Sequence, residues 1–155
     1  MTRALFLDRD GTINVDYGYV HEPERFELVP GVLEFCSKAQ SQGYAIIVVT
    51  NQSGIERGYF TEGQYLALES HMLRLFSDAG VRITDVFHCA SLTGPDRKPE
   101  PGMFLKAMKK HNINMKNSVN IGDKERDLEA GRRAGVGRNL LFTGDWELLA
   151  REMRF

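Results

Sequence analysis

The apolar run Ala4-Leu5-Phe6-Leu7 leads directly into Asp8-Arg9-Asp10-Gly11-Thr12 and constrains the fold more than any other stretch. A short apolar run without polar alternation is typical of a strand buried on both faces, as in a parallel sheet. Strands of this kind present ligand-binding residues at their carboxyl ends. We therefore expect Asp8 to end the first strand and Asp10 to lie on the next loop, where Gly11 permits a tight turn.

Two carboxylates spaced i, i+2 repel each other when both are ionised. A divalent cation would relieve this repulsion and hold an anionic substrate beside them. Asp8 and Asp10 are therefore candidate metal and catalytic residues. The plainer alternative is a polar turn at the end of a strand, and the rest of the chain argues against it.

The remaining sequence alternates short apolar segments with helical patterns. Strands are expected at residues 44–49, 86–89, 118–121 and 140–142, and helices are expected to begin near Pro30, Thr61, Pro101, Lys124 and Trp146. Residues 13–29 are expected to form a structured loop that can include a short hairpin. This alternation predicts an α/β fold, a Rossmann-like parallel sheet of about five strands with helices on both faces and no cap domain.

Composition narrows the class of protein. The 155 residues suit one domain spanning 1–155, and 42% hydrophobic with 26% charged residues is typical of a soluble protein. A net charge of -1 gives no general attraction to nucleic acid or an anionic membrane. Cys36 and Cys89 form no C-x-x-C pair, so neither a zinc knuckle nor a disulfide framework is indicated. Without a signal peptide or a long apolar run, we expect a cytoplasmic protein and a monomer.

Chemically active residues follow four of the predicted strands. The four groups are Asp8 with Asp10, residues 50–54 (TNQSG), Arg97 with Lys98, and Asp123-Lys124 with Asp127. Because the carboxyl ends of parallel strands share one edge of a sheet, these groups are expected to meet. Carboxylates suit Mg²⁺, and Lys98 and Thr50 can hold phosphoryl oxygens. The set indicates phosphoryl transfer with an aspartate nucleophile.

Each later segment also has a plainer interpretation. Residues 50–54 can be a turn and helix cap, and Arg97 and Lys98 can be solvated surface charges. Asp123 can be a helix N-cap and Asp127 a solvated acid in the first helical turn. The argument for a site is that all of these candidates fall on one edge of the sheet.

These segments are recognisable as a set. Residues 8–14 (DRDGTIN) resemble the first motif of the haloacid dehalogenase superfamily of phosphatases, and residues 50–54, 97–99 and 122–124 are similar to its other motifs, in order. Within this superfamily the chain resembles the branch that acts on heptose 1,7-bisphosphate or histidinol phosphate. Residues 16–21 (DYGYVH) and 55–58 (IERG) favour the heptose activity, so the resemblance implies Mg²⁺-dependent hydrolysis of the sugar's 7-phosphate.

The resemblance also implies residue roles. Asp8 would attack phosphorus to form an aspartyl-phosphate, and Asp10 would act as general acid and then general base. Mg²⁺ would be held by Asp8, Asp123 and the backbone carbonyl of Asp10, while Thr50 and Lys98 would steady the phosphoryl group. Asp127 would lie outside direct contact. The sugar phosphate would be bound by Asp16, Tyr17, Gly18, Tyr19, Asn51, Gln52, Ser53, Arg97 and Lys124.

One departure from the branch is evident. Its members usually carry a zinc loop, Cys-x-His followed by Cys-x-Cys, just before the Arg-Lys-Pro. Here Cys89 remains, but Ser91 stands at the histidine position and Asp96 directly precedes Arg97. We therefore expect no structural zinc, and an uncapped site in which loops alone select the sugar.

Alternatives remain open at this point. The nearest is histidinol-phosphate hydrolysis; a polynucleotide 3'-phosphatase is disfavoured by the absence of a basic stripe. A non-catalytic receiver-like domain would also place a phosphorylated Asp on such a sheet, but at a later strand. A homologue that only binds sugar phosphate is disfavoured because all the expected catalytic side chains are present.

Overall fold

The computed structural model describes all 155 residues and contains one five-stranded sheet. The strands are β1 (Ala4–Leu7), β2 (Ala45–Asn51), β3 (Ile83–Cys89), β4 (Val119–Gly122) and β5 (Arg138–Leu141). They lie in the order β3-β2-β1-β4-β5, and every neighbouring pair is parallel. The predicted Rossmann-like α/β fold is confirmed.

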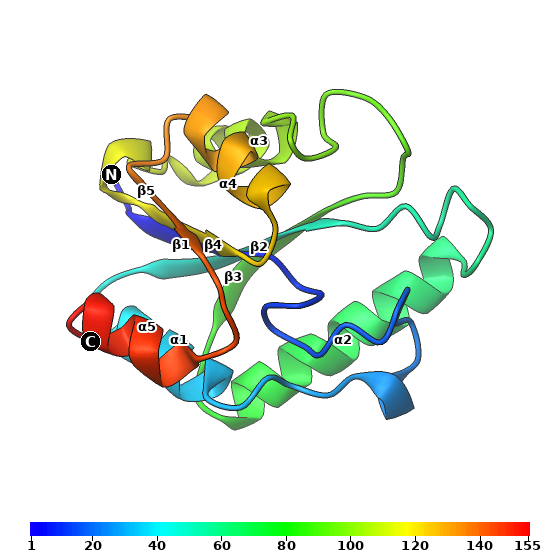
Figure 1. Cartoon of the computed structure of the whole chain (residues 1–155), viewed down its shortest axis with the longest axis horizontal. Coiled ribbons are helices and arrows are strands. Elements are labelled where there is room, and N and C mark those ends of the chain that lie inside the picture. The colour runs from blue at the N-terminus through cyan, green and yellow to red at the C-terminus, as the bar shows by residue number, and fades with distance from the viewer.

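Helices cover both faces of the sheet (Figure 1). Helices α1 (Val32–Ser41), α2 (Glu62–Asp78) and α5 (Trp146–Glu152) lie on one face, and α3 (Gly102–His111) and α4 (Glu125–Arg133) on the other. Short 3₁₀ helices span Pro23–Arg25 and Met115–Asn117. None of these helices is both long enough and apolar enough to span a membrane.

Strand β1 is apolar throughout because it contributes to two cores. In β1, Leu5 and Leu7 point into the core shared with α1, α2 and α5, while Ala4 and Phe6 point into the core against α3 and α4. Successive strand residues face opposite sides of a sheet, so a strand buried on both faces needs apolar side chains at every position. This explains why the first apolar run shows no alternation.

The order of the strands determines where a site can form. The chain passes outward from β1 to β2 and β3, then returns to place β4 on the other side of β1. The carboxyl ends of β1 and β4 therefore lie at the point where the direction of winding reverses, which is where such sheets bind ligands. The loops that follow β1, β2 and β3 extend from this edge, on the right in Figure 1.

Several element boundaries differ from those predicted. β1 ends at Leu7 rather than Asp8, although the Asp8 amide still donates to the Ile121 carbonyl at 3.1 Å. β3 begins three residues earlier than predicted, at Ile83, and β5 spans 138–141 rather than 140–142. The early part of β3 contains a register shift and the charged Asp85, which hid it from the apolar pattern. In the loop 13–29, an antiparallel bridge pairs Asn14 with Leu28, so the short hairpin is present.

Candidate active site

Asp8 and Lys98 form the buried centre of the site. The Lys98 Nζ donates to Asp8 Oδ1 at 3.0 Å and to the Val49 carbonyl at 2.7 Å, and lies 2.7 Å from Asp127 Oδ1. Only 2% of the Lys98 side chain is exposed. Burial raises the pKa of Asp8 well above its ordinary value, and the carboxylates of Asp127 and Asp123 add to this while Lys98 opposes it.

The pKa of Lys98 reflects the same environment. Burial by itself lowers the pKa of an ammonium group, but the carboxylates of Asp8 and Asp127 more than offset it, so the pKa of Lys98 is raised. Lys98 therefore remains an ammonium ion at neutral pH. An ammonium that contacts a buried carboxylate at the edge of a cavity is placed to offset the charge of an anion bound there.

A group of three carboxylates surrounds this ammonium. Oxygen atoms of Asp8, Asp123 and Asp127 all lie within 4.8 Å of one another. Lys98 contacts two of them, whereas Asp123 receives a 3.3 Å hydrogen bond from the Thr12 hydroxyl. One ammonium does not balance three carboxylates, and carboxylate oxygens are the donors that Mg²⁺ prefers. The residues present therefore fit a divalent cation bound by Asp8 and Asp123.

Gly11 allows the Asp123 carboxylate to lie close to the turn after β1. Gly11 has a φ of +86°, a left-handed conformation that glycine adopts without strain. A Cβ atom built at this position would overlap the carboxylate of Asp123. The turn after β1 therefore requires glycine both for its backbone conformation and for the room that the Asp123 carboxylate needs.

Asp10 is connected to the loop that follows β2. Gln52 Nε2 donates to Asp10 Oδ2 at 2.9 Å and to the Thr50 hydroxyl at 2.9 Å. Asn14 Nδ2 donates to Asp10 Oδ1 at 3.0 Å. The side chain of Asp10 is 21% exposed, so it borders the open cavity while these donors hold it.

The loop that carries Arg97 and Lys98 is fastened by side chains. Asn51 Oδ1 accepts from the Lys98 amide at 3.0 Å, and Asn51 Nδ2 donates to the Lys98 carbonyl at 3.1 Å. Farther along the loop, the Glu56 carboxylate accepts from the Leu92 amide, and Asp96 pairs with Lys106. These contacts fasten the loop between Cys89 and Arg97 to neighbouring elements.

A cavity of about 340 Å³ opens beside Asp8 and Lys98. It is lined by Asp8, Asp10, Asp16, Gly18, Tyr19, Asn51, Gln52, Ser53, Arg57, Arg97, Lys98, Lys124, Arg126 and Asp127. Besides Lys98, the lining includes four cationic side chains. The lining also includes four carboxylates, those of Asp8, Asp10, Asp16 and Asp127, so the cavity offers cations for an anion beside carboxylates that suit a metal ion.

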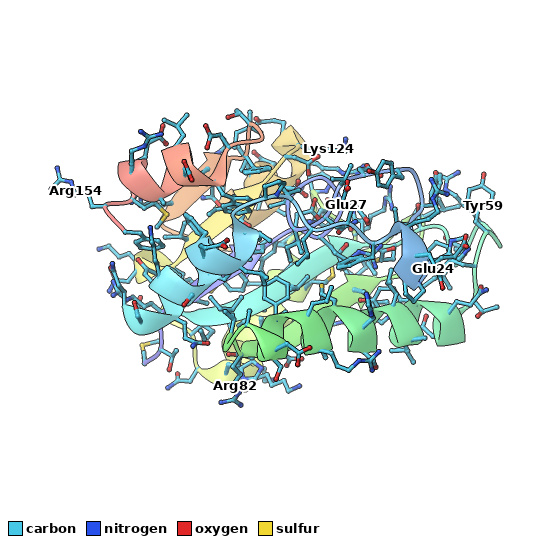
Figure 2. The ribbon with its side chains drawn as sticks, turned by 90° about the horizontal axis from the view of Figure 1, so that it is seen from below. Glu24, Glu27, Tyr59, Arg82, Lys124 and Arg154 are labelled. Atoms are coloured by element: carbon cyan, nitrogen blue, oxygen red, sulfur yellow. The ribbon has the colours of Figure 1, made fainter.

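Aromatic side chains border one side of the cavity. Tyr19, which lines it, packs edge to face against Tyr59 with ring centroids 4.7 Å apart. Figure 2 shows Tyr59 at the end of the molecule that also carries Glu24, opposite Arg154. The contact joins the loop after β1 to the loop after β2 at the outer side of the site.

Most of the residues selected from the sequence meet around this cavity, and three do not line it. Thr50 is buried behind it, and Asp123 belongs to the carboxylate group beneath it. The Tyr17 hydroxyl instead donates to Glu27, a hydrogen bond that raises the pKa of Tyr17. Tyr17 therefore points to a neighbouring part of its own loop rather than into the cavity.

Three lining residues were not among the predicted site residues. Asp127 was grouped with Asp123 and Lys124 but expected to lie outside direct contact, with a solvated helical acid as the plainer alternative. In the structure it is buried, accepts from the Lys124 amide and pairs with Lys98. Arg126 lies in the first turn of α4, two residues after Lys124, and this spacing does not mark it, because helical residues two apart face different directions. Arg57 lies in a turn that begins where β2 ends, five residues after Gln52.

Comparison with known proteins agrees with this geometry. Residues 7–135 match the family described as haloacid dehalogenase-like hydrolase. The chain is 43% identical over 141 residues to D-glycero-alpha-D-manno-heptose-1,7-bisphosphate 7-phosphatase of Campylobacter jejuni, covering 90% of this chain and 82% of that protein. It is 44% identical over 148 residues to D-glycero-beta-D-manno-heptose-1,7-bisphosphate 7-phosphatase of Vibrio cholerae, covering 89% and 80%.

A solved structure gives the same result. The D,D-heptose 1,7-bisphosphate phosphatase of B. bronchiseptica, complexed with magnesium and phosphate, superposes with a TM-score of 0.88 and 25% identity over 99% of this chain and 98% of that one. The family match begins at the last residue of β1 and includes β2, β3, β4 and all four loops that meet at the cavity. The chain therefore belongs to the haloacid dehalogenase-like hydrolase family.

Proposed function

We propose that the chain is a Mg²⁺-dependent phosphatase that removes the 7-phosphate from D-glycero-D-manno-heptose 1,7-bisphosphate. The observation that carries this proposal is the arrangement of charges in one cavity. A buried Asp8–Lys98 pair lies beside the carboxylates, and further cations surround the opening. A substrate with two phosphate groups has one for each of these regions, which agrees with the activity named for the relatives.

Asp8 is the proposed nucleophile. Its carboxylate oxygen forms a bond to phosphorus while the bond from phosphorus to the sugar oxygen breaks. Asp10 in its acid form gives a proton to that departing oxygen, so the sugar leaves as an alcohol. Asp10 then takes a proton from water, whose oxygen bonds to phosphorus and releases Asp8 and inorganic phosphate.

Other residues would stabilise the phosphoryl group during both steps. Lys98 and the Thr50 hydroxyl would hold its oxygens as charge develops. A bound Mg²⁺, held by Asp8, Asp123 and the carbonyl of Asp10, would supply positive charge beside the phosphoryl oxygens. The rest of the sugar would contact the loop of Asp16, Gly18 and Tyr19.

The second phosphate would bind at the cationic rim. Arg97 and Lys124 are the proposed ligands, and Arg57 and Arg126 line the same cavity. None of these four side chains forms an ion pair with a carboxylate. Their charge is therefore free to bind an anion, and bidentate arginine contacts suit phosphate.

A substrate panel tests this function. Phosphate release would be measured with both anomers of the heptose 1,7-bisphosphate, histidinol phosphate and a 3'-phosphorylated oligonucleotide. We expect kcat/KM to be at least about tenfold higher for a heptose bisphosphate, a difference worth about 1.4 kcal/mol in the transition state. A preference for histidinol phosphate would overturn the substrate assignment.

The nucleophile is tested separately. Asp8→Asn should lower turnover by at least about a thousandfold and leave the fold intact, because the substitution removes the attacking carboxylate and preserves its shape. Circular dichroism would serve as the folding control. An Asp8→Asn protein with undiminished turnover would exclude Asp8 as the nucleophile.

We also propose that the 155 residues act as one catalytic domain that uses no structural zinc. The contacts of Asn51, Glu56 and Asp96 support this by fastening the loop that precedes Arg97. Metal analysis of the purified protein should find less than about 0.1 zinc per chain, because the tetrahedral sites that hold structural zinc need four ligands. One equivalent of tightly bound zinc would contradict the proposal.

A further inference from the structure

Arg9 lies between the two acids of the first loop and is almost completely buried. Its side chain is 2% exposed, and its guanidinium lies against the carboxylate of Asp10. Arg9 Nη2 donates to both oxygens of Asp10, at 3.0 and 3.1 Å, and to the Val20 carbonyl at 2.8 Å. The guanidinium carbon also lies 5.9 Å from the centre of the Tyr65 ring on α2.

This buried charge is costly for the fold. Arg9 Nη1 is buried and has no hydrogen-bond partner, and the same holds for Asn14 Oδ1 beside it. A buried donor without a partner costs about 1–3 kcal/mol, and buried ion pairs are often no more stable than apolar replacements. Stability alone therefore does not account for an arginine at this position.

The contacts fix the orientation of the Asp10 carboxyl group. Oδ1 accepts from Arg9 Nη2 and from Asn14 Nδ2, each at 3.0 Å. Arg9 Nε is a third donor to the same oxygen, at 3.4 Å. Oδ2 accepts from two donors, Gln52 Nε2 at 2.9 Å and the shared Arg9 Nη2 at 3.1 Å. Because Oδ2 has fewer donors than Oδ1, it is the oxygen that we expect to exchange a proton with substrate or water.

We propose that Arg9 is a positioning residue for the proton transfers assigned to Asp10, an inference that rests on the proposed function. Arg9 itself touches no substrate. It anchors Oδ1 so that the proton on Oδ2 passes to the departing oxygen while the bond from that oxygen to phosphorus breaks. Because Arg9 also donates to the Val20 carbonyl, it links the loop that carries Asp16 and Tyr19 to the Asp10 carboxyl group.

The test compares two esters that differ mainly in the leaving group, p-nitrophenyl phosphate and phenyl phosphate. The p-nitrophenolate ion leaves readily without a proton, whereas phenolate needs one, so general acid catalysis matters mostly for phenyl phosphate. The value of kcat/KM reports the first chemical step for both. For Arg9→Gln we expect kcat/KM to fall about 10–100-fold with phenyl phosphate and less than about threefold with p-nitrophenyl phosphate.

Matched variants separate positioning from folding. Arg3 also stacks on a tyrosine ring, that of Tyr44, and donates to a backbone carbonyl, that of Gln42, but lies outside the site. Arg3→Gln should leave both esters unchanged. Arg9→Lys keeps the charge and one donor, so it should restore part of the activity on phenyl phosphate. An equal loss on both esters, no loss, or failure of both Arg9 variants to fold would overturn the positioning role.

Wild type and Asp10→Asn, measured in the same experiment, test the proposed function separately from the inference about Arg9. Asp10→Asn should show the selective loss on phenyl phosphate even more strongly than Arg9→Gln. If the wild-type protein hydrolyses neither ester, or Asp10→Asn shows no selective loss, the function proposed for the site fails. If wild type and Asp10→Asn behave as expected and Arg9→Gln equals wild type, only the inference about Arg9 fails.

Discussion

Replacing Lys98 by methionine should destabilise the protein more than any surface substitution. The ammonium lies 3.0 Å from Asp8 and 2.7 Å from Asp127, and 2% of the side chain is exposed. Methionine fills a similar volume but carries no charge, so two carboxylates remain without their shared cation. Removing one partner of a buried ion pair costs about 3–5 kcal/mol. We expect the free energy of unfolding of Lys98→Met to fall by that amount at pH 7.

The stability lost in Lys98→Met should increase as the pH rises. Burial raises the folded-state pKa of Asp8, so its contribution to stability is present below its unfolded pKa, near about 4, and is lost as pH rises through the folded pKa. Lys98 opposes that rise, and removing it raises the folded pKa of Asp8 further. The difference between Lys98→Met and wild type should therefore be smallest near pH 4 and grow toward pH 7.

Urea denaturation followed by circular dichroism would measure this difference with a chelator present. The chelator matters because a bound cation would replace part of the missing charge; adding Mg²⁺ should recover some stability. Lys106→Met is the matched control, since the exposed Lys106 pairs with Asp96 at the surface and its loss should cost less than about 1 kcal/mol. If Lys98→Met is destabilised by no more than Lys106→Met, the buried pair does not hold the site together.

Three further outcomes are expected. Gly11→Ala should lower turnover at least about tenfold, because its Cβ would displace Asp123. Gly43 has a similar positive φ but open space around it, so Gly43→Ala should cost about 1–2 kcal/mol of stability and no activity. Equal activities of the two variants would contradict this expectation. Burial raises the pKa of Asp85, but hydrogen bonds from two basic side chains of α3 more than offset it, so the pKa is lowered. Asp85 therefore stabilises the fold above its unfolded pKa of about 4, and Asp85→Asn should cost under about 1 kcal/mol at pH 7. Urea denaturation should show this cost disappearing as the pH falls through the lowered pKa of the folded state. A chelator should abolish phosphate release and added Mg²⁺ should restore it; activity in excess chelator would exclude the metal.

The fold could be predicted because most of its strands carry a strong local signal. The first apolar run predicts β1 within one residue, since a strand buried on both faces has no other composition available. The start of β3 was missed for the opposite reason. Asp85 interrupts the apolar pattern, and it is tolerated there because Lys110 and His111 reach it from α3. A local pattern carries no information about a partner that arrives from another element.

The site residues likewise divide into those that the local sequence predicts and those that depend on distant contacts. Asp8, Lys98 and Asp123 were selected because each follows a predicted strand, and parallel topology brings such positions to one edge. For Asp127 the plainer interpretation was a solvated acid, because first-turn helical acids commonly are, and the family resemblance placed it outside direct contact. Its burial depends on Lys98, which is distant in sequence. The role inferred for Arg9 likewise depends on contacts with Val20 and Asp10 that only the folded chain reveals.

The two halves of the site are held by different kinds of interaction. Asp8 and Asp123 follow β1 and β4, whose backbone pairing continues through the Asp8 amide, so their separation is fixed by the sheet. Lys98 and Arg97 lie on a long loop that is fastened to Asn51 by two side-chain hydrogen bonds. Backbone pairing is preserved with many different side chains, whereas a loop held by side-chain hydrogen bonds can be released by a single substitution. Substitutions in these loops should therefore alter substrate selection while the acidic centre keeps its geometry.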